Sequence, residues 1–295
     1  MDETSRRAAL RALYELPGHL LWRAAARVTA EAHGILPGDG GIHAYAALLA
    51  LAEREPRSQR GLAAAVGVSR TTLTAVGRTL QRDGLVERVR DPADRRCYAL
   101  TRTPVGGSAL RRWSADVERL ERHLTTPLSR DETRRLRELL TVVIEDQPLS
   151  LTPSALLAST GFLLTRAHQR AHRDFAAALA ALGIEPRDFG TMRCLQVAGP
   201  LTQGEVASLL DVSPASVVQI VDGLEAAGLV VRRRGVEDRR VHLLHLSARA
   251  RGVLAEATEL SDLVLEDRIG GRGSPRHDDL VRLLGTLLGA GVASS

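Results

Sequence analysis

Two Asp-Arg-Arg triplets, at residues 94–96 and 238–240, are the residues of this sequence whose types and spacing fit a defined chemistry. Arginine side chains bind phosphate and guanine through two parallel hydrogen bonds. In each case a hydroxyl residue follows nine positions after the Asp, namely Thr103 and Ser247. A single triplet of this kind is typical of a solvated surface. Its repetition at matched places favours contact with a polyanion.

The composition agrees with such a partner. The chain has 295 residues, and all 40 of its cationic side chains are Arg. With 35 Asp and Glu residues, the net charge is +5. Aromatic residues make up only 3%, so we expect cores of Leu, Val and Ala, which favours helices. Two cysteines give no disulfide framework and suit a reducing compartment. The sequence shows neither a signal peptide nor an apolar run of ~18 residues, so we expect a cytoplasmic protein that does not interact with membranes.

The chain contains an internal repeat. When residues 58–107 are placed on residues 202–251, an offset of 144 without gaps, 14 of 50 positions are identical. Such a period is too long for a solenoid, so each copy is a whole domain. Pro148 and Pro153 interrupt helical patterning between the copies. We therefore expect two domains, residues 1–148 and 149–295, joined near residues 147–154.

Each copy has the pattern of two helices joined by a short turn. In the first, a helix over residues 59–66 ends at Gly67, and Ser69 stands at the N-cap position of a second helix that ends before Gly84. In the second, Ser213 stands at the matching N-cap position, followed by Pro214. Apolar residues recur at helical spacing in both second helices. This is a helix-turn-helix arrangement.

Short alternating segments follow each helix pair, at residues 85–90 and 229–234, and again at 97–103 and 241–247. Two strands that flank an arginine-bearing loop predict a β-hairpin, or wing. The sequence thus predicts two winged helix-turn-helix domains in a mainly helical chain.

The sequence SPASVVQIVDGLEAAGLVVRRRGVEDRR, residues 213–240, resembles the MarR family of transcription regulators. The first copy resembles the family through SRTTLTAVGRTLQRDGLVERVRDPADRR, residues 69–96, and adds the motif TPVG at 103–106. Amphipathic stretches stand where the family places its dimerisation helices, at residues 13–32, 108–124, 130–144, 155–182 and 251–268. The resemblance covers nearly the whole chain, twice.

The resemblance implies a sequence-specific regulator of transcription that binds double-stranded DNA, with a repressor relieved by a small-molecule effector as the expected mode. Family members work as homodimers, whereas this chain carries both copies. Recognition helices must lie about 34 Å apart to enter successive major grooves, and we expect one monomer to meet this requirement as an intramolecular pseudodimer. No phosphate loop, nucleophile elbow or HExxH motif is present, so we expect no enzyme activity and no cofactor.

The candidate DNA-binding residues come from the recognition helices and the wings. They are Ser69, Arg70, Thr71, Thr72, Thr74, Arg78, Arg95 and Arg96 in the first copy, and Ser213, Ala215, Ser216, Gln219, Arg239 and Arg240 in the second. By resemblance, Arg95 and Arg239 enter the minor groove, and Arg96 and Arg240 contact phosphate or the neighbouring Asp. The first recognition helix is richer in hydrogen-bond donors and the second wing richer in charge, which predicts an asymmetric operator.

Other residues have two interpretations. His19, Trp22 and Arg23 are candidates for an effector site, although core packing is favoured for Trp22. His168 and His172 share a helix face but lack a third ligand at diagnostic spacing, so we expect no metal. Cys194 is expected to be buried, and redox sensing by Cys97 is disfavoured. We call each winged helix-turn-helix domain a head. An alternative function remains, in which one of the two heads has lost DNA binding and serves protein–protein interaction.

Overall fold

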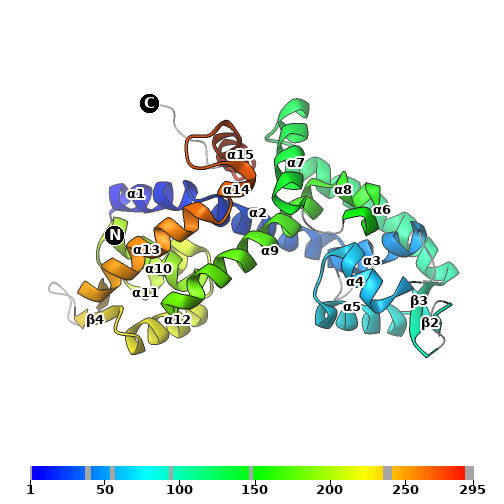
Figure 1. The fold of residues 1–295 in the computed structure, drawn as a ribbon, viewed down its shortest axis with the longest axis horizontal. Coiled ribbons are helices and arrows are strands. Elements are labelled where there is room, and N and C mark those ends of the chain that lie inside the picture. The colour runs from blue at the N-terminus through cyan, green and yellow to red at the C-terminus, as the bar shows by residue number, and fades with distance from the viewer. Residues whose placement is uncertain are drawn as a thin grey trace. The chain divides into compact units, whose positions relative to one another are not determined.

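The computed structural model describes residues 2–36, 41–53, 57–92, 96–145, 149–234 and 241–289. Its elements are mostly helices with two small antiparallel hairpins, which confirms the predicted fold class (Figure 1). The chain forms two compact units, one of residues 23–168 with 286–295, the other of residues 1–22 with 169–285. We call them the 23–168 unit and the 169–285 unit. The predicted domain boundary, between residues 148 and 149, separates the two copies of the sequence repeat. The compact units are divided differently, because each combines segments from both copies. The predicted boundary therefore stays a prediction.

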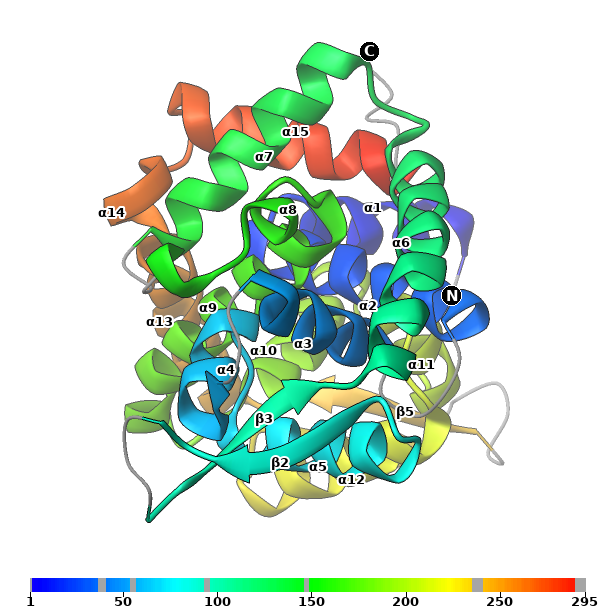
Figure 2. The ribbon, with the colours of Figure 1, turned by 90° about the vertical axis from the view of Figure 1, so that its right-hand side faces the viewer.

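The 23–168 unit contains the first helix-turn-helix pair and its wing. Strands β2 and β3 form an antiparallel hairpin in which Arg88 faces Leu100, and β1 extends the sheet beyond β3 (Figure 2). The elements are α2 (Pro17–Ile35, which begins in the other unit), α3 (Gly41–Glu53), β1 (Arg57–Ser58), α4 (Gln59–Val66), α5 (Arg70–Arg82), β2 (Val86–Arg90), β3 (Tyr98–Arg102), α6 (Pro104–Thr125), α7 (Arg130–Ile144), the 3₁₀ turn η1 (Leu149–Leu151) and α8 (Ser154–Leu157).

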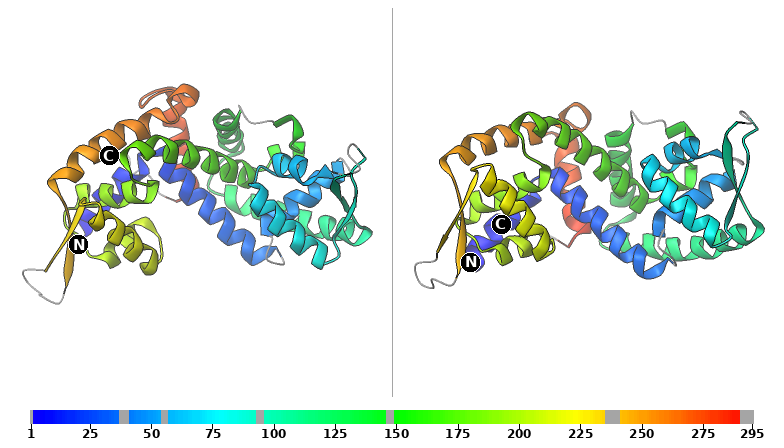
Figure 3. Two further views of the ribbon diagram at one scale, coloured as in Figure 1. Left: turned by 60° about the horizontal axis from the view of Figure 1, so that its bottom comes forward. Right: turned by 90° about the horizontal axis from the view of Figure 1, so that it is seen from below.

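The 169–285 unit contains the second pair and its wing. Strands β4 and β5 run side by side (Figure 3), and an isolated bridge from Leu201 to Leu244 takes the place of β1. The elements are α1 (Glu3–Tyr14), α9 (Thr160–Leu179, which begins in the other unit), the 3₁₀ turn η2 (Ala180–Leu182), α10 (Pro186–Ala198), α11 (Gln203–Leu210), α12 (Pro214–Ala226), β4 (Val230–Arg234), β5 (His242–Leu246), α13 (Ala248–Leu263), α14 (Glu266–Ile269) and α15 (Pro275–Leu287).

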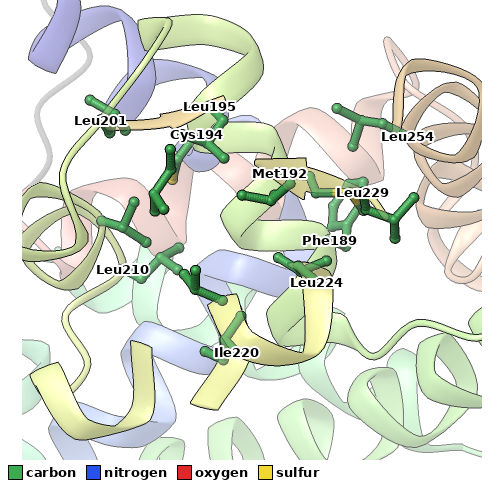
Figure 4. Packing of buried hydrophobic residues seen from close by; sticks show 14 of the residues in the cluster. Phe189, Met192, Cys194, Leu195, Leu201, Leu210, Ile220, Leu224, Leu229 and Leu254 are labelled. Carbon is green, nitrogen blue, oxygen red and sulfur yellow. The ribbon is translucent and has the colours of Figure 1, made fainter. Parts of the chain in front are cut away.

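The first helix of the chain belongs to the core of the second head. Helix α1 packs against α10, and its residues Ala9 and Leu13 are each 1% exposed. They join a buried cluster that includes Phe189, Met192 and Leu224 (Figure 4). Full burial of one leucine contributes about 1.5–3 kcal/mol. The second head is therefore stabilised by residues nearly two hundred positions earlier in the chain.

A carboxylate on α6 caps the start of α9 within the 23–168 unit. Glu121 accepts hydrogen bonds from the backbone N–H groups of Thr160 and Gly161, both at 2.9 Å, and from the hydroxyl of Ser159. Arg137 of α7 lies 3.7 Å from the same carboxylate and donates to the Thr160 hydroxyl at 2.8 Å. Negative charge at a helix N-terminus is favourable because the first N–H groups have no partner within the helix. This cap ties α6, α7 and α9 together.

Within the described part of the chain, no single helix is both long and apolar enough to cross a membrane. The pair α11 and α12, bent by 113°, reaches the required length and composition only when its two helices are counted together.

Candidate nucleic-acid interface

Helix α5 is an amphipathic helix with a polar outer face. The Ser69 hydroxyl accepts from the backbone N–H of Thr72 at 3.0 Å, which satisfies one of the free donors at the helix start, and it contacts the Thr72 hydroxyl at 2.8 Å. Leu73, Val76, Gly77 and Leu80 are buried, whereas Arg70, Thr71 and Arg78 are exposed and Thr72 and Thr74 half-buried. The candidates outside the cap thus lie away from the buried stripe.

Helix α12 repeats this construction with different chemistry. The Ser213 hydroxyl accepts from the Ser216 backbone N–H at 3.1 Å and contacts the Ser216 hydroxyl at 2.8 Å. Val217, Ile220, Val221 and Leu224 are buried, while Ala215 and Gln219 are exposed and Val218 is 42% exposed. The outer face of α12 is therefore more apolar than that of α5.

The turns between the paired helices both use left-handed backbone but differ in residue. Gly67 ends α4 at φ 75°, and the equivalent Asp211 ends α11 at φ 55°. A Cβ atom on Gly67 would lie 1.8 Å from Nη1 of Arg166, a residue of α9 that is 4% exposed. Glycine is therefore favoured in the first turn for two reasons: left-handed backbone disfavours other residues, and the buried Arg166 guanidinium would have to move to admit a Cβ atom.

Thr103 and Ser247, the hydroxyl residues nine positions after the Asp of each Asp-Arg-Arg triplet, form hydrogen bonds at the base of each wing. Thr103 donates to the carbonyl of Gly84 at 2.7 Å and caps α6 by accepting from Gly106 at 3.0 Å. Ser247 does the same in the second head, at 2.8 Å to the Gly228 carbonyl and 3.1 Å from the Ala250 N–H. Each hydroxyl thus joins the end of a recognition helix to the start of the helix after the wing. Sequence reasoning found their spacing but not this role.

The two recognition helices carry opposite charge. Helix α5 contains three Arg and no acidic residue, a sum of +3, whereas α12 contains Asp222 and Glu225 and no basic residue, a sum of −2. Arg232 of β4 binds Asp222 at 2.5 Å and also binds Glu225. The hydrogen bond to Asp222 is the main cause that raises the pKa of Arg232 above its ordinary value. Sequence reasoning missed this bridge, because the charges at aligned positions show only that the two copies differ there.

The first wing presents an aromatic ring between two cations. The Cζ atoms of Arg88 and Arg90 lie 5.2 and 4.6 Å from the centroid of the Tyr98 ring, which is 46% exposed as a residue. Arginine above an aromatic face is attracted by the ring quadrupole. Arg96 is exposed in the turn before β3, while the candidates Arg95, Arg239 and Arg240 lie outside the described residues.

The effector candidates fall in or near the start of α2. The His19 ring lies 6.0 Å from the Tyr14 ring and 5.4 Å from the Trp22 ring, and Trp22 is half-buried. Arg23 follows Trp22 on the same helix and is also half-buried, and the effector role of the three residues stays a prediction. Among the residues that the structure describes, no group of three or more His, Cys, Asp or Glu side chains could hold a metal ion.

The two cysteines have different environments. Cys194 is buried, as predicted, and burial raises the pKa of its thiol to about 12, whereas Cys97 is exposed. Because the thiolate is the nucleophile, a thiol whose pKa is raised stays protonated and unreactive at pH 8. We expect native protein to take up one equivalent of iodoacetamide, on Cys97, and denatured protein two, measured by mass spectrometry. A Cys97→Ser variant that still takes up label in the native state would contradict this.

Two capped helix pairs, each followed by a locked antiparallel hairpin, define a protein with two winged helix-turn-helix domains. Residues 42–98 and residues 182–241 each match the MarR family. The chain therefore carries two MarR family domains in tandem, one in each of these two segments.

The known proteins that are similar to this chain match only part of it. It is 34% identical over 98 residues to a protein of Thauera aromatica provisionally assigned as a transcriptional regulatory protein for the hcr operon, and 44% identical over 64 residues to the uncharacterized HTH-type transcriptional regulator YcgE of Bacillus subtilis. These matches cover 33% and 22% of this chain and 59% and 42% of the relatives, so the chain spans about half the length of the curated relatives it matches. The crystal structure of CouR from Rhodococcus jostii RHA1 bound to p-coumaroyl-CoA is 26% identical, with a TM-score of 0.42, over 46% of this chain and 96% of CouR.

Proposed function

We propose that the chain is a sequence-specific, double-stranded DNA-binding regulator of transcription that represses until a small ligand releases it. One observation carries this proposal. In both copies a serine, Ser69 or Ser213, caps a recognition helix whose outer face is exposed, and a hydroxyl residue forms a hydrogen bond at the base of the wing. A fold that had kept only its core would not need a capped recognition helix and a hydrogen-bonded wing base in both copies. DNA as the partner would place the protein in the cytoplasm.

The chain is proposed to act as a monomeric pseudodimer, with one head for each half of a pseudo-palindromic operator. The supporting argument is that helix-turn-helix proteins read two half-sites about one helical turn apart, and this chain carries two heads covalently joined. The candidate contacts are those of α5 and α12 with the wing-tip residues Arg95, Arg96, Arg239 and Arg240.

The test is selection of tight-binding duplexes from a random library, followed by light scattering and footprinting of the full chain. We expect a free mass near 31.8 kDa, one chain per duplex, and two protected major-groove segments about 10 base pairs apart. Complexes that always contain two chains per duplex would overturn the pseudodimer. Failure of the library to yield any bound duplex would overturn the proposed function.

The footprint is expected to be asymmetric because the recognition helices differ. Arg70 and Thr71, at the start of α5, can form hydrogen bonds with base edges, whereas Ala215 and Val218 of α12 suit thymine methyl groups. The first half-site should therefore show strong hydrogen-bond readout and the second a weaker one. Equivalent contacts in both halves would contradict the asymmetry.

A second candidate function has one specific observation in its favour. The acidic sum of α12 and the exposure of Val218 and Val231, at 42% and 40%, fit a head that binds protein instead of DNA. Salt dependence discriminates between the two. If both heads contact at least six phosphates in total, affinity should fall by about 10³ between 50 and 200 mM salt, whereas a single bound head should lose far less.

A further inference from the structure

The two heads differ at one aligned pair of positions that joins the recognition helix to the wing. In the second head, Arg232 of β4 binds Asp222 of α12. With the repeat offset of 144, the matching residues of the first head are Arg88 of β2 and Arg78 of α5. The strand keeps its arginine, but the helix carries arginine where its counterpart carries aspartate.

The surrounding residues do not restore the missing negative charge. Glu225, the second acid bound to Arg232, corresponds to Gln81. Among the described residues, Arg78 and Arg88 have no acidic side chain within ion-pair distance, and both are exposed. By alignment with Asp222 and Arg232, the first head carries two like charges at the positions where the second has an ion pair, on elements that also contact each other. Like charges brought close together repel.

Arg88 has an aromatic partner instead of an acidic one. Its Cζ atom lies 5.2 Å from the Tyr98 ring centroid, on the strand directly paired with β2. Stacking on an aromatic ring restrains a guanidinium while leaving its N–H donors available. An anion that entered between Arg78 and Arg88 would meet one restrained donor group and would remove the repulsion.

We propose that Arg78 and Arg88 form a phosphodiester-binding site of the first head, and that the second head lacks this site because Asp222 and Glu225 engage Arg232. This inference rests on the proposed DNA-binding function. It adds Arg88 to the contact residues and assigns this phosphate contact to the first head alone. Phosphate is favoured over a base edge because base contacts come from the N-terminal part of a recognition helix, whereas Arg78 stands at its ninth residue and Arg88 on the wing.

The same comparison changes the expected balance between the two wings. The second wing has more arginine, but Asp222 and Glu225 neutralise Arg232. We therefore expect the first head to supply the larger share of the phosphate contacts made where recognition helix and wing meet. The ion pair in the second head instead joins β4 to α12 without any ligand.

The test compares the full-length chain with Arg78→Asp, which recreates the ion pair of the second head, and with Arg78→Ala, which removes one charge only. Affinity for a selected duplex is measured by fluorescence anisotropy at several salt concentrations. We expect Arg78→Asp to weaken binding about 10- to 100-fold and to lower the slope of log affinity against log salt by about 1–2, since both arginines are lost to the phosphate. Arg78→Ala should lower the slope by about 1.

A second measurement separates this site from a general loss of charge or of folding. Without DNA, Arg78→Asp should melt at the same temperature as the wild type or higher, because Arg88 gains a partner. The reciprocal variant Asp222→Arg with Glu225→Gln should raise the salt slope by copying the first head. Arg88→Ala combined with Arg78→Asp should have no higher melting temperature than the wild type.

The outcomes distinguish the two proposals. If the wild type binds DNA and Arg78→Asp has the same affinity and salt slope, the phosphate site is wrong and the DNA-binding function stands. If no duplex binds the wild type, the proposed function fails. A rise in wild-type melting temperature with inorganic phosphate, absent in Arg78→Asp and larger than with chloride of equal ionic strength, would then assign the two arginines to a free phosphate and overturn a phosphodiester ligand.

Discussion

Replacement of Gly67 by alanine should destabilise the 23–168 unit by about 2–5 kcal/mol. Left-handed backbone costs a residue with a Cβ atom about 1–2 kcal/mol, and φ at Gly67 is 75°. The new Cβ atom would also lie 1.8 Å from Nη1 of the buried Arg166, and overpacking of this kind costs about 1–3 kcal/mol. Urea unfolding followed by Trp113 fluorescence, in a Trp22→Phe background, would measure the change because Trp113 is buried in this unit.

A matched control isolates the contact with Arg166. Gly84 has φ 68° in the same head, and a Cβ atom there would meet nothing within 4 Å, so Gly84→Ala should cost only the backbone part. The double variant Gly67→Ala with Arg166→Ala should cost less than the sum of the two single variants. Equal losses for Gly67→Ala and Gly84→Ala would show that the Arg166 contact is unimportant.

Removal of the Glu121 carboxylate should cost about 2–4 kcal/mol of the stability of the same unit. The Glu121→Ala variant leaves the Thr160 and Gly161 N–H groups and the Ser159 hydroxyl without their acceptor. Loss of an N-cap costs about 1 kcal/mol, and one further buried polar group left unsatisfied adds about 1–3 kcal/mol. The same fluorescence experiment measures the change.

Glu118 of α6 provides the control, because it is exposed on the same helix. Glu118→Ala removes the same charge and should change stability by less than about 0.5 kcal/mol. Glu121→Gln, which keeps one acceptor oxygen, should lie between the two. If Glu121→Ala is as stable as Glu118→Ala, the cap does not hold α9 in place.

The local parts of the fold could be predicted because neighbouring residues determine them. Ser69 and Ser213 begin their helices as predicted, Gly67 ends α4 in the left-handed conformation, and both hairpins form where alternation indicated. Each of these features follows from backbone preference, capping or side-chain period within about twenty residues.

The remainder depends on contacts between residues far apart in sequence. Nothing near Leu13 indicates that its helix packs against α10 in the core of the second head, and nothing near Glu121 indicates that it caps the start of α9. The bridge from Arg232 to Asp222 spans ten residues but requires knowledge of how the wing leans on the helix. The candidate contact residues themselves stay predictions, since their role depends on a bound duplex.

The packing of α1 has a consequence for synthesis of the protein. Helix α1 leaves the ribosome well before α10, the helix that packs against it, which begins only at Pro186. The apolar side of α1 therefore lacks this partner while the intervening residues, which include the whole first helix-turn-helix pair and its wing, are synthesised. A gene cut between the two repeats would separate these partners, so the tandem protein is not simply two independent regulators written one after the other.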